Sequence, residues 1–106
     1  MTAANVDFVS KFMGRALEQR VITTVDVDQK LIKDGDLFLT RRLDGMDPFY
    51  MVSTGSHAAH AAIALRNDQG ELYIIEAQSA YYFKDGESGV QATKFDEWLD
   101  WARSSD

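Results

Sequence analysis

The sequence predicts an α+β domain in which an antiparallel sheet is flanked by an N-terminal and a C-terminal helix. Three observations carry this prediction: an amphipathic segment near the start, a strand–turn–strand pattern in the middle and an aromatic amphipathic segment near the end. The length of 106 residues and the hydrophobic share of 45% suit one compact globular domain. Residues 1–106 are therefore expected to form a single domain, or half of a larger one.

The first element is a helix predicted over residues 5–20. Its apolar side chains recur at helical spacing, while the charged residues lie mostly off their stripe. We expect the apolar stripe to face the core. The residues that form it are Phe8, Val9, Phe12, Met13, Ala16 and Leu17.

Three strands are predicted next, over residues 36–42, 58–66 and 71–77. The Gly35-Asp36 step is a turn signal that opens the first of them. The alanine-rich second segment also fits a helix on propensity. We favour a strand there, because the apolar third strand follows a turn and needs a hydrogen-bonded neighbour.

The remaining segments are predicted as loops and one helix. Residues 43–55 contain Asp-Gly, Asp-Pro and Thr-Gly steps and are expected to form an ordered loop, and a second loop is expected to run through Gln91. The last helix is predicted over residues 94–103 with Thr93 as its N-cap. Its stripe carries large aromatics, so we expect the apolar face around Trp98 to bind a complementary C-terminal half or a second copy.

Composition excludes several classes of protein. Eleven Lys and Arg against 17 Asp and Glu give a net charge of −6, which argues against binding to nucleic-acid phosphates. No run approaches the roughly 20 apolar residues of a membrane span, and the N-terminus lacks a secretory signal pattern, so we expect a cytoplasmic protein. The chain has no cysteine and so holds no disulfide, thiolate metal site or cysteine nucleophile.

The two histidines, His57 and His60, do not predict a metal site. On a strand, residues three apart point to opposite faces, and only carboxylates remain as further ligands. We therefore expect neither a metal nor a cofactor.

His60 and Glu76 form the candidate catalytic pair. If the hairpin turns through a three-residue loop with Gly70 in the left-handed region, Ala62 faces Glu76, and His60 and Glu76 are diagonal neighbours on one face, about 7–8 Å apart at the backbone. A glutamate there can orient the imidazole and raise its basicity, as in a hydrolytic triad. A four-residue loop would shift the register by one and separate the two residues. The alternative interpretation is a pair of ordinary polar residues near strand ends.

The nucleophile for such a pair is missing. The nearby hydroxyls do not lie in a Gly-x-Ser-x-Gly elbow, so a serine hydrolase is not predicted. These hydroxyls belong to Ser53, Thr54, Ser56 and Ser79.

Three segments, taken in order, resemble a known family. They are Gly35-Asp36-Leu37-Phe38, Ser56-His57-Ala58-Ala59-His60-Ala61-Ala62-Ile63-Ala64 and Leu72-Tyr73-Ile74-Ile75-Glu76-Ala77. They resemble the circularly permuted papain-fold (NlpC-type) cysteine hydrolases. The stretch from Asp44-Gly45-Met46-Asp47-Pro48 through Trp98 most closely resembles an uncharacterised eukaryotic branch of that family.

The resemblance covers residues 33–103 and implies a site. His60 would be the general base and Glu76 the polar residue that orients it. In the permuted order the catalytic cysteine follows the glutamate strand and the next helix, and this chain has no cysteine. Ala62 also stands where the family usually has glycine.

Three interpretations follow. The chain is the base-bearing portion of a thiol amidohydrolase or acyltransferase, inactive alone because the cysteine-bearing half is absent or a separate polypeptide. Alternatively, it is a module that has lost its nucleophile and binds a peptide, a lipid or a protein. The third interpretation is a structural domain with no such chemistry.

Overall fold

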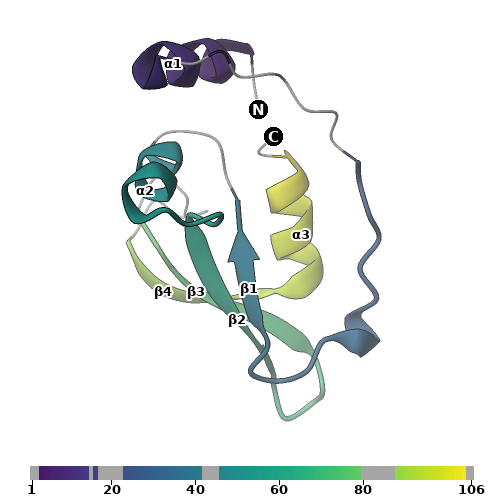
Figure 1. The fold of residues 1–106 in the computed structure, drawn as a ribbon. Helices are drawn as coiled ribbons and strands as arrows, with labels where there is room; N and C mark the ends of the chain where they lie inside the picture. The colour runs from purple at the N-terminus through teal and green to yellow at the C-terminus, as the bar shows by residue number, and fades with distance from the viewer. Residues whose placement is uncertain (1–2, 15, 17–22, 42–45, 80–87, 105–106) are drawn as a thin grey trace. The chain divides into compact units, whose positions relative to one another are not determined.

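The fold class predicted from the sequence is confirmed: the chain is α+β, with a four-stranded antiparallel sheet in the order β1-β2-β3-β4 (Figure 1). The structure, a computed structural model, describes residues 3–14, 16, 23–41, 46–79 and 88–104. In chain order the elements are α1 (Ala3–Met13), the short 3-10 helix η1 (Gln29–Leu31), β1 (Leu37–Thr40), α2 (Asp47–Thr54), β2 (His60–Arg66), β3 (Leu72–Gln78), β4 (Gly89–Lys94) and α3 (Phe95–Ser104).

These elements divide between two compact units. One unit is built from residues 1–27 and 41–60 and contains α1 and α2. The other is built from residues 28–40 and 61–105 and contains most of the sheet together with η1 and α3. His60, the first residue of β2, lies at the boundary between the two.

The β2–β3 hairpin has the predicted turn. Gly70 has a φ of 79°, in the left-handed region, and its N–H donates to the carbonyl oxygen of Asn67 at 2.9 Å. The Asn67 N–H then donates to the carbonyl oxygen of Glu71 at 3.0 Å, which closes a three-residue loop. A turn followed by a left-handed glycine sets the register of a hairpin, here Ile63 opposite Ile75.

One face of the sheet packs against α3. Phe38 of β1 contacts two aromatic rings of the helix, with ring centroids 6.3 Å from Phe95 and 5.8 Å from Trp98. Small side chains on β2 leave room for this aromatic layer. The buried apolar cluster consists of Ile32, Ala62, Ala64, Leu72, Ile74, Phe95 and Trp98.

Two helix predictions need correction. α1 ends at Met13 rather than near residue 20, because Gly14 takes a φ of 63° and ends the helix; residue 15 and residues 17–22 lie outside the described part. The segment predicted as a loop over residues 43–55 contains α2. Pro48 lies in the first turn of α2, where its fixed φ is tolerated, and Gly55 ends the helix with a φ of 67°.

The loop predicted through Gln91 is also wrong, because Gly89–Lys94 is a strand. β4 pairs with β3 over six residues, from Tyr73 opposite Lys94 to Gln78 opposite Gly89. Its sequence has no apolar run, so hydrogen bonding to β3 rather than local preference makes it a strand. Thr93, predicted as the helix N-cap, lies inside this strand, and α3 begins at Phe95.

Candidate functional site

Glu76 is a buried carboxylate that accepts hydrogen bonds from the neutral side chains of Trp98 and Gln78. Its side chain is only 3% exposed. The indole Nε1–H of Trp98 donates to Oε1 at 3.0 Å, and the amide Nε2–H of Gln78 donates to Oε2 at 3.0 Å. Burying a carboxylate is costly unless its oxygens are hydrogen-bonded, so these two bonds account for its place in the core.

The local structure explains how the three side chains meet. Glu76 and Gln78 are two residues apart on β3, so they point to the same face of the sheet. β4 pairs with β3, and α3 starts directly after β4. Trp98, the fourth residue of α3, thereby comes back over the strand that carries Glu76.

His60 is in a strand and not in a helix. It is the first residue of β2, and the alternation of that strand groups it with Ala62 and Ala64, which are buried. His57 precedes the strand and is exposed. Its carbonyl oxygen accepts a hydrogen bond from Nε of Arg41 at 3.0 Å, and this bond helps to hold the backbone just before β2.

The predicted pairing of His60 with Glu76 requires a strand at the alanine-rich segment and a three-residue loop in the hairpin. The alanine-rich segment forms a strand over His60–Arg66, and the hairpin has the three-residue loop. The observed register runs from Ile63 opposite Ile75 to Arg66 opposite Leu72, and the predicted pairing of Ala62 with Glu76 stays a prediction. The contact between the His60 imidazole and the Glu76 carboxylate stays a prediction.

The hydroxyls near His57 bond to the backbone. Ser53 and Thr54 donate to the carbonyl oxygen of Tyr50 at 3.2 and 2.6 Å. The Ser56 hydroxyl accepts from the backbone N–H of Ala58 at 3.1 Å. These contacts are typical of a helix end and a turn, and they do not activate a nucleophile.

Within the described residues, no three His, Asp or Glu side chains gather closely enough to bind a metal ion. None of the helices in that part of the chain combines the length and the apolar character needed to cross a membrane.

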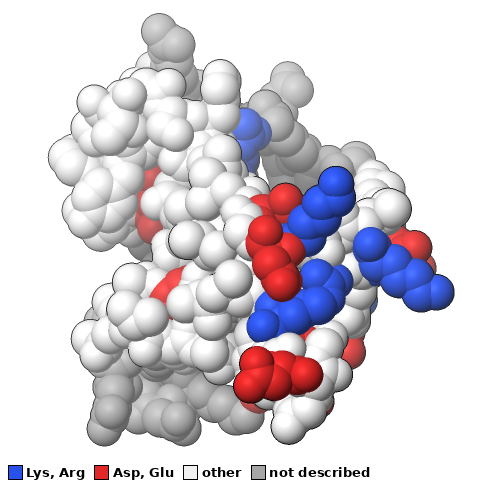
Figure 2. Space-filling model, turned by 90° about the horizontal axis from the view of Figure 1, so that it is seen from below, with Lys and Arg blue, Asp and Glu red and all other residues white. Residues whose placement is uncertain are grey.

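Charged side chains form local pairs of opposite sign. Nζ of Lys94 lies 2.8 Å from a carboxylate oxygen of Glu71, and Arg66 pairs with Asp34 at 3.4 Å. The hydrogen bond from Lys94, followed by that from the Asn67 amide, lowers the pKa of Glu71, and the same bond raises the pKa of Lys94. Acidic and basic side chains are intermixed in the view of Figure 2, so the face shown there does not form a patch of one sign.

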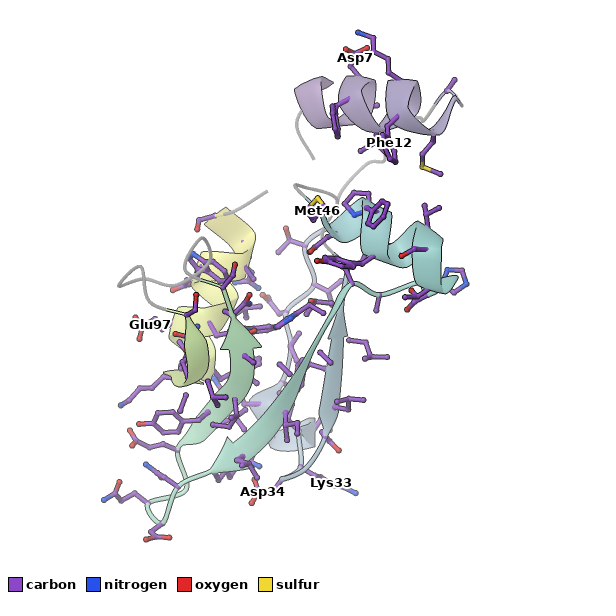
Figure 3. The ribbon with its side chains drawn as sticks, turned by 90° about the vertical axis from the view of Figure 1, so that its left-hand side faces the viewer. Asp7, Phe12, Lys33, Asp34, Met46 and Glu97 are labelled. Carbon is purple, nitrogen blue, oxygen red and sulfur yellow. The ribbon has the colours of Figure 1, made fainter. Side chains whose placement is uncertain are left out.

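An apolar groove lies between α1 and α2. Its cavity measures about 260 Å³. Phe12 of α1 and Met46, just before α2, lie on the facing sides of the two helices (Figure 3), and the Phe12 ring is 6.4 Å from that of Phe49. The groove was not predicted, because α2 was expected to be a loop. Its walls are Phe8, Val9, Phe12, Met13, Met46, Pro48, Phe49 and Val52.

The surface expected around Trp98 is not available to a partner. Trp98 is 8% exposed, and its ring lies in the core of its own unit, against Phe38 and Phe95. The apolar stripe of α3 is therefore covered by the sheet. The exposed apolar surface of this unit is on the opposite side of the sheet, where Leu39 and Val90 are 65% and 77% exposed.

Comparison of the chain with protein-family models, with curated proteins and with solved structures finds no match in any of the three.

Proposed function

We propose that this chain supplies a general base, His60, and its orienting carboxylate, Glu76, to a thiol-dependent amidohydrolase or acyltransferase. The nucleophilic cysteine is contributed from outside these 106 residues, since the chain has none. In this role His60 takes the proton of the thiol and so produces the thiolate, which is the nucleophilic form. Glu76 fixes the orientation of the ring.

The observation that supports this proposal most is the buried carboxylate of Glu76. An apolar side chain at this position would bury without any hydrogen-bonding requirement, whereas Glu76 needs the bonds from Trp98 and Gln78. The residues around Glu76 thus resemble the surroundings of the buried acid in a hydrolytic triad.

The experiment that tests the proposal follows the imidazole nitrogens by NMR. The chain has only two histidines, so a His57→Ala variant assigns both rings. The hydrogen bond made by one ring nitrogen sets the tautomer of a neutral histidine. We expect Glu76→Gln to change the tautomer balance of His60 and to leave His57 unchanged, while Gln at position 76 can still accept from Trp98. A His60 ring that does not respond to Glu76→Gln contradicts the proposal.

A second candidate function is a non-catalytic, protein-binding module. The specific observation in its favour is the exposed apolar face of the sheet, where Leu37, Leu39 and Val90 are more than half exposed. Binding through that face would survive a His60→Ala, Glu76→Gln double variant, whereas the hydrolase role would not. Comparing partner binding by the double variant and by the wild-type chain separates the two functions.

A further inference from the structure

Both faces of the sheet carry apolar side chains, but α3 covers only one of them, the side that holds the buried apolar cluster. The side covered by α3 carries five polar residues in β1, β3 and β4, namely Thr40, Glu76, Gln78, Gln91 and Thr93. The uncovered side is largely apolar. Five of its large side chains, Leu37, Leu39, Ile63, Leu65 and Val90, are between 44% and 77% exposed, and Tyr73 and Ile75 of β3 lie on the same side and are half-buried.

This uncovered side, the open face, does not have the composition of a solvent-facing surface. An antiparallel sheet with one covered side normally places its polar residues on the other side. Contiguous exposed apolar patches of a few hundred Å² or more mark interaction sites on soluble proteins. The open face has exposed side chains from β1, β2 and β4, and Tyr73 and Ile75 of β3, between β2 and β4, point to the same side, so it extends across all four strands.

We propose that the occupant of the open face is a second copy of this chain, with the two sheets stacked face to face. The open face is the largely apolar side of a sheet, and the apolar side of a second sheet complements it. A second copy offers the same side-chain spacing, and aligned sheets pack about 10 Å apart with interdigitated side chains. A twofold axis brings the same patch of each copy together, as in most homodimers.

The position of the charges agrees with this stacking. Among the described strand residues on the open face, Lys94 is the only charged one, and it is the last residue of the edge strand β4. Its Nζ is held by Glu71 at 2.8 Å, and both side chains keep about half of their surface exposed. Lys33 and Asp34 lie at the end of the sheet, beside the turn before β1 (Figure 3). Two stacked copies therefore leave their charges at the rim and bury no unpaired one.

The area of the open face predicts a weak and reversible dimer. Four strands about 4.8 Å apart, with about six residues each, form a face of roughly 400 Å². Two copies would bury roughly 800 Å² in total, less than the roughly 1,200–2,000 Å² of stable interfaces. Each copy also carries a charge of −6, so added salt should strengthen association by screening the repulsion.

Sedimentation velocity over a wide concentration range tests the proposal, which does not depend on the proposed function. We expect a shift from monomer to dimer as the wild-type concentration rises, and a larger dimer fraction at higher salt. Val90→Lys, on the open face, should abolish the shift. Phe12→Lys, in the groove between α1 and α2, adds the same charge at a side chain that is 65% exposed and should leave the shift unchanged. Circular dichroism confirms that each variant is folded.

Three results would overturn the proposal. A wild-type chain that stays monomeric at every concentration leaves the open face to another occupant. A dimer that survives Val90→Lys uses a different surface. A dimer that Phe12→Lys abolishes and Val90→Lys does not is formed through the groove of the first unit.

Discussion

The two faces of the sheet differ in what they carry and in what covers them. On the α3 side, Glu76 is 3% exposed and its oxygens accept hydrogen bonds from Trp98 and Gln78. On the open side, Val90 is 77% exposed and Leu39 is 65% exposed. Glu76 therefore lies among the buried apolar residues, where water is excluded, whereas Leu39 and Val90 lie where water has access.

This difference shows which interactions hold the unit together. A hydrogen bond to a carboxylate matters most where no water can replace it, so the contacts around Glu76 are expected to be strong. Leu37, Leu39 and Val90 on the open face keep more than half of their surface in water, so shortening one of them removes little buried surface from the monomer. Equivalent substitutions should thus have large effects on one face and small effects on the other.

The largest expected effect is that of Trp98→Ala. This change removes a buried ring from the aromatic layer and leaves Oε1 of Glu76 without its donor. We expect a loss of about 3–5 kcal/mol in the free energy of unfolding, a large share of the total for a chain of this size. Urea denaturation followed by circular dichroism measures it.

Leu39→Ala is the matched control on the open face. At a protein concentration that keeps the chain monomeric, we expect the free energy of unfolding to stay within about 0.5 kcal/mol of the wild-type value. Equal losses of unfolding free energy for Trp98→Ala and Leu39→Ala would show that the two faces are equally buried in solution and would contradict the difference in burial between them.

Trp98→Phe has the next largest effect and isolates the hydrogen bond from the packing. The ring stays aromatic, but the N–H that donates to Glu76 is lost, and we expect a cost of about 1–3 kcal/mol. A double-mutant cycle with Glu76→Leu measures the coupling. In the double variant neither partner is left unsatisfied, so its loss should be smaller than the sum of the two single losses. Additive losses would indicate that the bond does not form.

The hairpin was predictable from the sequence because its determinants are local. Asn67 and Gly70 define the turn, and the turn sets the register of β2 against β3. α2 was missed for an equally local reason. An Asp-Pro step and a Thr-Gly step mark turns, but they also mark the first turn and the end of a helix, and eight residues are too few to show a clear period.

The surroundings of Glu76 were not predictable, because they depend on contacts between distant residues. Trp98 lies 22 positions away in the sequence, and β4, which connects the two, has no strand-like apolar pattern. The stripe of α3 indicated that some surface covers Trp98, and the sheet of the same unit proved to be that surface. Alternation along a strand likewise separates two faces without showing which of them a helix covers.

The smallest expected effect concerns Lys94, the charged residue on the open face. Its hydrogen bond lowers the pKa of Glu71, so the pair contributes stability above the ordinary pKa of 4.5, and this contribution is lost as the pH falls through the lowered value. The pKa of Lys94 is raised, so its contribution to stability is present below pH 10.5 and is lost as the pH rises through the raised value.

The free energies of unfolding of the wild type and of Lys94→Met at pH 7 and pH 3 test this, because the difference between the two proteins should shrink at pH 3. High salt should also shrink it at pH 7, since both side chains are exposed to water. A difference that stays the same at both pH values would mean that Lys94 acts through its aliphatic stem on the open face rather than through its charge.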